Sequence, residues 1–365
     1  MAIQSSVNIG GVWKSVSALS VNIGGVWKAV VGAWTNIGGA WKAWFSKEVS
    51  YYGTATSLSA SRSYLSATTV GNYVVFGGGL GGTGDTVDAY NTSLTRSTPT
   101  ALSVTRNYLS SAPVGNYALF GGGYNPNTTA VVATVDAYNT SLTRSTPTAL
   151  SAARAYAAAS FNTNYAVFGG GGSTVDAYNS SLTRSTPTAL SVGRSFLNAT
   201  TIGGYVLFAG GSGGGYWTTV DAYDTSLTRS TPTALSSGRR YLAATAITDY
   251  ALFGGGEPAA STVTTTVDAY NSSLTRSTPT ALSVARNHAA GASVDNYAIF
   301  AGGSFGTTKY DTVDAYNSSL TRSTPAALTG VRNLISAAPI SNYVLFGGGF
   351  DATTYSSLVE VYQVS

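Results

Sequence analysis

Residues capable of acid–base or nucleophilic chemistry are few in this sequence of 365 residues. There is one histidine, His288, and there is no cysteine. The chain therefore offers no thiol nucleophile and no thiolate metal ligand, and a Ser-His-Asp arrangement could be built only around His288. Because His288 occupies a place where other repeat units have Tyr64 or Phe196, we interpret it as one member of a series of large residues. We expect no enzymatic activity, no bound metal and no cofactor.

Two sets of charged residues recur at regular intervals. The acidic set is Asp88, Asp136, Asp176, Asp221, Asp268, Asp314 and Glu360. The basic set is Arg62, Arg106, Arg154, Arg194, Arg239, Arg286 and Arg332. Recurrence in every unit favours a structural role, in which each carboxylate accepts hydrogen bonds from backbone or arginine. Contact of the arginines with an anionic ligand stays open as the alternative.

The composition indicates which elements must position these residues. Hydrophobic residues make up 44% of the chain and charged residues 9%, with 43 glycines and 24 tyrosines. This pattern favours many short strands joined by tight turns, so we expect an all-β protein. A net charge of +4 is too small and too dispersed for a nucleic-acid groove. We expect no membrane insertion and no export signal, because no stretch approaches 18 apolar residues and the N-terminus lacks a basic region followed by an apolar one.

One phrase, TVDAY, marks a long repeat. It recurs at intervals of 40 to 48 residues, at Val87, Val135, Val175, Val220, Val267 and Val313, with the variant VEVY at Val359. Each unit offers a small-residue strand, an apolar strand ending in glycines, the TVDAY strand and an outer strand near RSTPTALS. Four short strands per unit at this period are typical of a β-propeller blade, so seven units predict seven blades.

The two ends of the repeat region complement each other. The seventh unit lacks an outer strand, whereas YYGTATSLSASR, which starts at Tyr51, resembles STPTALSVTR but follows no earlier unit. We therefore predict a propeller over residues 49–365 whose seventh blade is closed by a strand at 51–59. Closure of this kind removes the exposed sheet edges of an open ring.

These units resemble those of the kelch family of propellers. The shared features are an apolar strand ending in a glycine pair, a Val-x-x-Tyr strand, and an arginine before the next inner strand. The resemblance covers residues 50–365 and implies a seven-bladed propeller. The chain departs from the family pattern after the tyrosine, where kelch units usually have tryptophan and this chain reads NTSLTRS.

Residues 1–48 carry a different, shorter repeat. VNIGGVWK, VNIGGVWK and TNIGGAWK begin at Val7, Val21 and Thr35. A Gly-Gly pair between apolar residues is typical of a two-residue hairpin turn, so we expect a meander of three small hairpins. We expect the tryptophans to pack within this segment and its docking contacts, with a carbohydrate-stacking face as the alternative. The tandem GGVWK phrase resembles segments of phage tail and tail-fibre proteins, which implies attachment to a particle or oligomerisation.

The units differ from one another mainly in the loops that follow the glycine clusters. Near-identical scaffold with divergent loops is how a repeat protein diversifies a binding face. We expect that face to combine the loops with the large residues two positions after each arginine. The candidate binding residues are Tyr64, Tyr108, Tyr124, Tyr156, Phe196, Tyr216, Trp217, Tyr241, His288, Phe305, Lys309, Tyr310, Phe350 and Tyr355. Aromatic loops with little charge suit neutral sugars or a protein epitope; the alternative is that they are ordinary loop residues.

The sequence thus leads to a functional hypothesis. We expect a non-catalytic receptor-binding protein of a phage tail or related particle, which binds a host-surface glycan or protein through the loops and other tail proteins through residues 1–48. It would reside in the virion, and homo-oligomerisation stays open. One alternative is a bacterial surface or secreted adhesin. A second is a carbohydrate-active enzyme of the epimerase type, because kelch-like propellers include such enzymes. A third is a purely structural virion decoration with no ligand.

Overall fold

The computed structural model describes residues 6–9, 12–15, 20–23, 26–29, 32–37 and 40–365, with side chains from residue 47 onward. Its regular elements are all β-strands, as the composition predicts. None of the described residues belongs to a helix that is long and apolar enough to cross a membrane. Contacts divide the chain into two units, residues 1–48 with Ser365, and residues 49–364.

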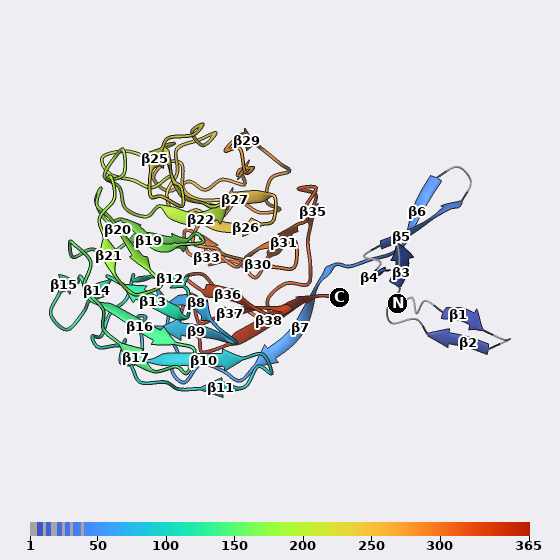
Figure 1. Cartoon of the computed structure of the whole chain (residues 1–365), viewed down its shortest axis with the longest axis horizontal. Coiled ribbons are helices and arrows are strands. Elements are labelled where there is room, and N and C mark those ends of the chain that lie inside the picture. The colour runs from blue at the N-terminus through green and yellow to red at the C-terminus, as the bar shows by residue number, and fades with distance from the viewer. Residues whose placement is uncertain (1–5, 10–11, 16–19, 24–25, 30–31, 38–39) are drawn as a thin grey trace. The chain divides into compact units, whose positions relative to one another are not determined.

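Residues 49–364 form a seven-bladed β-propeller, which confirms the predicted fold. Each blade is a four-stranded antiparallel sheet, and the strands that line the centre are visible in Figure 1. The innermost strands are β8 (Ser66–Val70), β12 (Ser110–Val114), β18 (Ala157–Phe161), β22 (Asn198–Ile202), β26 (Ala243–Ile247), β30 (Ala290–Val294) and β36 (Ser336–Ile340). The second strands are β9 (Tyr73–Gly77), β13 (Tyr117–Gly121), β19 (Tyr165–Gly170), β23 (Tyr205–Ala209), β27 (Tyr250–Gly254), β31 (Tyr297–Ala301) and β37 (Tyr343–Gly347).

The outer half of each blade contains the TVDAY strand and a short edge. The third strands are β10 (Val87–Asn91), β16 (Val135–Asn139), β20 (Val175–Asn179), β24 (Val220–Tyr223), β28 (Val267–Tyr270), β34 (Val313–Tyr316) and β38 (Val359–Val364). The edge strands of the first six blades are β11 (Arg96–Ser97), β17 (Arg144–Ser145), β21 (Arg184–Ser185), β25 (Arg229–Ser230), β29 (Arg276–Ser277) and β35 (Arg322–Ser323). Two-residue edges leave little unpaired backbone for another chain to join.

The seventh blade is completed by a strand from before the first blade. Strand β7 (Val49–Ala55) pairs antiparallel with β38. The pairing therefore runs over 49–55 rather than over the predicted 51–59. The residues that follow act as the linker into the first blade, where Leu58 is buried and its N–H donates to the carbonyl of Ser357.

Neighbouring blades are held together by apolar contacts. Phe120 packs against Gly77 of the preceding blade so closely that a Cβ at Gly77 would lie 2.9 Å from Phe120 Cε1. The same glycine position contacts the next blade's phenylalanine at Gly121, Gly169, Gly254 and Gly347. The innermost strands neighbour one another in order, and β36 neighbours β8, which closes the circle. Burial on both faces explains why the second and third strands are apolar without strict alternation.

The recurrent arginines and carboxylates form one buried ion pair in each blade. Arg62 Nη2 lies 2.7 Å from Asp88 Oδ2, and both side chains are fully buried. The other oxygen of Asp88 accepts the backbone N–H of Ser59, which lies in the linker. Equivalent pairs occur in all seven blades, with Arg332 and Glu360 in the last. This burial supports the structural role and rules out the alternative of direct contact between these arginines and an anionic ligand.

The N-terminal unit consists of three hairpins. Its strands are β1 (Ser6–Ile9), β2 (Val12–Ser15), β3 (Ser20–Ile23), β4 (Val26–Ala29), β5 (Gly32–Ile37) and β6 (Ala40–Ser46). Among the described residues these strands make three separate two-stranded sheets, so the meander is a succession of hairpins rather than one sheet. The predicted packing of the tryptophans lies outside the described side chains.

The four remaining strands form two small hairpins. They are β14 (Tyr124–Asn125) with β15 (Ala130–Val131), and β32 (Ser304–Phe305) with β33 (Thr308–Lys309). Both lie in the variable loops that follow the glycine clusters.

Candidate functional site

A ring of seven residues surrounds one end of the central channel. Each blade supplies one residue, two positions after its buried arginine. The ring residues are Tyr64, Tyr108, Tyr156, Phe196, Tyr241, His288 and Leu334. Six of them were predicted from the sequence, and Leu334, the aliphatic member, was not.

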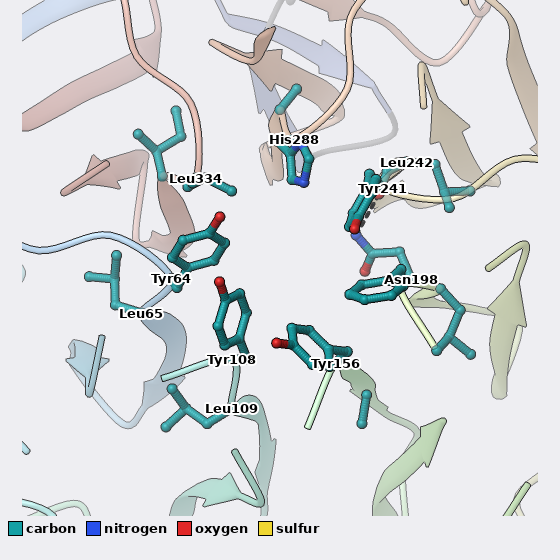
Figure 2. A pocket seen from close by; sticks show the side chains of 15 residues that line it. Tyr64, Leu65, Tyr108, Leu109, Tyr156, Asn198, Tyr241, Leu242, His288 and Leu334 are labelled. Atoms are coloured by element: carbon teal, nitrogen blue, oxygen red, sulfur yellow. Dashed lines mark hydrogen bonds between the residues drawn. The ribbon is translucent and has the colours of Figure 1, made fainter. Parts of the chain in front are cut away.

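The side chains of the ring are arranged around the opening (Figure 2). From Tyr64 to His288, the centroids of consecutive rings lie 4.1, 4.4, 4.5, 4.7 and 4.1 Å apart. The hydroxyl groups of Tyr64, Tyr108 and Tyr156 border the opening. Tilted stacking of this kind adds to the stability that burial alone provides.

The backbone of the ring is equally regular. All seven residues have positive φ, from 51° to 60°. From Tyr108 to Leu334, each backbone N–H donates to the carbonyl of the ring residue before it, over 2.9 to 3.3 Å. A non-glycine residue in this left-handed region costs roughly 1–3 kcal/mol and persists only where the surroundings impose it. The propeller scaffold therefore fixes the position of each ring side chain.

The ring encloses a cavity of about 370 Å³. Its other lining residues include Asn198 and leucines at the starts of the inner strands, and none of the fifteen lining residues is Asp or Glu. Below it, a second cavity of about 310 Å³ is lined largely by Ser, Ala and Gly of the innermost strands, and the two share six lining residues, among them Ala157 and Leu197. The channel thus continues inward from the ring.

Burial favours the uncharged forms of Tyr108, Tyr156, Tyr241 and His288. Burial raises the pKa of Tyr108, and a side-chain hydrogen bond with Tyr64 raises it further. Burial also raises the pKa values of Tyr156 and Tyr241. For His288, burial is the main cause that lowers the pKa to about 4, with the positive charges of Arg240 and Lys309 as smaller causes.

Sequence reasoning missed a charged pair at the rim of the cavity. Arg240 donates from Nε and Nη2 to the two carboxylate oxygens of Glu257. Its guanidinium carbon lies 4.8 Å from the ring centroid of Tyr241, 5.4 Å from that of Tyr216 and 5.9 Å from that of Phe196. A signal was present in the sequence, because the other six blades have Ser, Asn or Ala at this position. Arg240 directly follows Arg239, which belongs to the recurrent set, so the repeat pattern did not single it out.

The variable loops emerge on the same face as the ring. In most blades, the residue just before the ring residue forms a β-bridge with the residue that follows the glycine pair. Examples are Asn107 with Tyr124 and Arg240 with Glu257. This pairing anchors the bases of these loops beside the ring.

The predicted loop residues are arranged around the ring and differ in exposure. Phe305 and Tyr355 are exposed, at 44% and 38%. Tyr355 stacks on Phe350, with ring centroids 5.6 Å apart. Tyr124, Lys309 and Tyr310 are partly buried. Tyr216 lies beside the rim of the cavity, where its ring faces the guanidinium of Arg240.

Trp217 is held at its backbone in the same way as Tyr310, by a hydrogen bond to the second glycine of the pair before its loop. Its backbone N–H donates to the carbonyl of Gly211. Its Nε1 is buried and has no hydrogen-bond partner among the described residues. The ring residues therefore line one cavity, whereas the predicted loop residues lie around it and do not line it.

The described residues contain no group of three or more His, Cys, Asp or Glu side chains that could hold a metal ion. The polar atoms at the cavity are phenol hydroxyls, the His288 imidazole and the Asn198 amide, whose Nδ2 donates to the carbonyl of Leu242. These groups can donate and accept hydrogen bonds from a hydroxylated ligand.

Comparisons with known proteins support the fold. The solved structure of YjhT matches with a TM-score of 0.58, over 85% of this chain and 99% of that one. The chain resembles YjhT in fold. Sequence identity is 13%, so the likeness shows the architecture alone. No protein-family model matches the sequence, and no curated protein matches it.

Proposed function

We propose that the protein is a non-catalytic receptor-binding protein that recognises a cell-surface glycan or protein through the ring and the surrounding loops. Within this proposal the propeller is of the kelch-like subtype, and residues 1–48 attach it to the tail of a phage or a related particle. The particle assignment rests on the resemblance of the GGVWK repeats to tail proteins. Homo-oligomerisation through the same segment is compatible with it.

The observation that carries the proposal is a contrast between two sets of strained residues. The first set is the ring. The second is Leu94, Leu142, Leu182, Leu227, Leu274 and Leu320, whose φ angles are 57° to 63°. Both sets therefore repeat a left-handed backbone from blade to blade, but the second set is always leucine while the ring contains Tyr, Phe, His and Leu.

This difference separates scaffold from surface. A left-handed backbone favours glycine or asparagine, and neither occurs in the ring. The left-handed backbone therefore does not explain why large side chains occur at these positions. Varied, preorganised aromatic residues around a cavity, next to loops that also vary, are what a recognition surface requires.

The chemistry of the cavity supports recognition rather than reaction. Among the described residues no carboxylate lines it, and the low pKa of His288 keeps its imidazole neutral at pH 7. Aromatic side chains combined with hydroxyl groups suit sugars and polar protein epitopes.

A binding assay tests the proposal. The fluorescently labelled full chain is incubated with a panel of bacterial strains, and bound protein is measured by flow cytometry. We expect saturable binding to some strains that Trp217→Ala and Tyr310→Ala weaken. Absence of saturable binding to every strain would contradict the proposal, and full binding by both variants would place the binding surface elsewhere.

The attachment role of residues 1–48 has a separate test. A chain that lacks residues 1–47 should remain folded but no longer copurify with particles that carry the full chain. Equal copurification would reject an attachment role for this segment.

A further inference from the structure

We propose that the ring cavity binds the terminal one or two sugars of a glycan chain end-on, so that the ligand is selected by how its chain ends. This inference rests on the proposed function, and it adds which part of the ligand is recognised and from which direction it enters.

Enclosure is the first argument. Neighbouring ring side chains from Tyr64 to His288 have centroids no more than 4.7 Å apart. Because non-bonded carbon atoms already touch at about 3.5–4.0 Å, no sugar chain can run sideways between them. Leu334 occupies the remaining place, between His288 and Tyr64 (Figure 2). A ligand therefore enters only along the channel axis.

Rigidity is the second argument. Six backbone hydrogen bonds connect the seven ring residues in order. The innermost strands below them close a full circle. Widening the ring to admit the middle of a chain would require breaking these contacts, whereas a chain end needs no such movement. The cavity is therefore preorganised for a terminus.

Size is the third argument. A cavity of about 370 Å³ lies near the lower limit of the roughly 300–1,000 Å³ that is usual for small-molecule sites. It suits one small unit rather than an extended oligosaccharide. The second cavity of about 310 Å³ shares part of the same lining, which leaves room for one further unit below the ring.

Charge and hydrogen bonding define the class of sugar. The cavity offers neutral phenols and the His288 imidazole, whose buried Nδ1 has no hydrogen-bond partner among the described residues. Among the described residues, the lining contains no Lys, Arg, Asp or Glu, and the guanidinium of Arg240 at the rim is paired with the carboxylate of Glu257. The hydroxyl groups and the imidazole can exchange hydrogen bonds with sugar hydroxyls. The expected ligand is therefore a hydroxyl-rich terminal sugar.

A glycan array tests the inference with the full chain. Oligosaccharides are fixed through their reducing ends, and each binder is compared in three forms: intact, shortened by an exoglycosidase that removes the terminal sugar, and extended by one more sugar. We expect the signal to fall at least tenfold in both altered forms. The free methyl glycoside of the terminal sugar should compete with the intact chain.

Two variants connect this result to the cavity. Ala157→Phe fills the space between the two cavities and should lower binding at least tenfold. Ser141→Phe adds a similar side chain in an exposed turn of the repeated NTSLTR phrase, outside the ring and the variable loops, and should bind normally. Melting temperature reports whether Ala157→Phe is folded; if it is not, Tyr156→Asn, which opens the ring wall, takes its place with the same expected loss.

The outcomes separate the inference from the proposed function. Array or cell binding that persists after removal or extension of the terminal sugar would overturn end-on capture but leave a recognition function intact. Normal binding by folded Ala157→Phe, or by Tyr156→Asn in its place, would also overturn it. Binding to no strain and to no glycan would reject both.

Discussion

Protonation of His288 should destabilise the folded protein as the pH falls. Its folded-state pKa is about 4, against 6.5 for the free side chain, mainly because of burial. The unfolded chain therefore binds a proton in a pH range where the folded chain does not. The stability that comes from burying the neutral imidazole is present above pH about 6.5 and is lost as the pH falls towards about 4.

The size of the effect follows from the shift. One pKa unit corresponds to about 1.4 kcal/mol, so the full loss is roughly 3 kcal/mol below pH 4. At pH 5 about 2 kcal/mol of it has gone. His288→Tyr provides the comparison, because four other blades have tyrosine at the equivalent ring position, and a tyrosine there does not titrate in this range.

Urea unfolding of both proteins at pH 7 and pH 5 measures the effect. We expect the wild type to lose about 2 kcal/mol more than His288→Tyr between these two pH values. All other titrating groups are common to the two proteins and cancel in this difference. Equal losses would refute the assignment of His288 as a buried neutral base, and a larger loss in the variant would reverse it.

Three further outcomes test the scaffold. Asp136→Asn leaves the buried Arg106 without its carboxylate and should lower the free energy of unfolding, measured in urea, by about 3–5 kcal/mol. The control, Asp224→Asn, lies at a turn position where other blades already have Asn and should leave the stability unchanged. Equal effects of the two substitutions would contradict a stabilising role of the buried pair. Gly347→Ala places a Cβ 2.7 Å from Phe76 Cε1 and should cost about 1–3 kcal/mol by thermal or urea unfolding, whereas an unchanged stability would mean that the blades separate easily. Deletion of residues 1–57 removes β7 and should make the protein sensitive to limited proteolysis, but deletion of residues 1–47 should not; equal resistance would show that closure by β7 is dispensable.

The propeller could be predicted from the sequence because its signals repeat. Every unit has the TVDAY-type strand, the glycine pair and the arginine at the same places. The strand order and the buried Arg–Asp pairs can therefore be inferred from one unit and compared with the other six. The limits of β7 were less accurate. The phrase TSLSASR matches the linker of other units, and the strand lies just before the matched residues.

The candidate site could be predicted from the sequence only in part, for a related reason. Ring residues stand at a fixed distance from the arginines, so their convergence could be predicted from topology. Arg240 and Glu257 are 17 positions apart and occur in one blade, so no repetition draws attention to them, and only the β-bridge between them brings them together. An aromatic pattern does not predict Leu334, because the backbone imposes the ring position and not the side-chain type.

The claim that the ring face is the recognition surface can be tested by comparing the two faces directly. Tyr156→Asn alters the ring, and Ser141→Ala alters an exposed turn of the repeated NTSLTR phrase. Affinity for a strain that binds the full-length wild-type chain is measured for both variants. The account predicts that Tyr156→Asn weakens binding at least tenfold and that Ser141→Ala leaves it unchanged; unchanged binding by a folded Tyr156→Asn, with loss in Ser141→Ala, would contradict it.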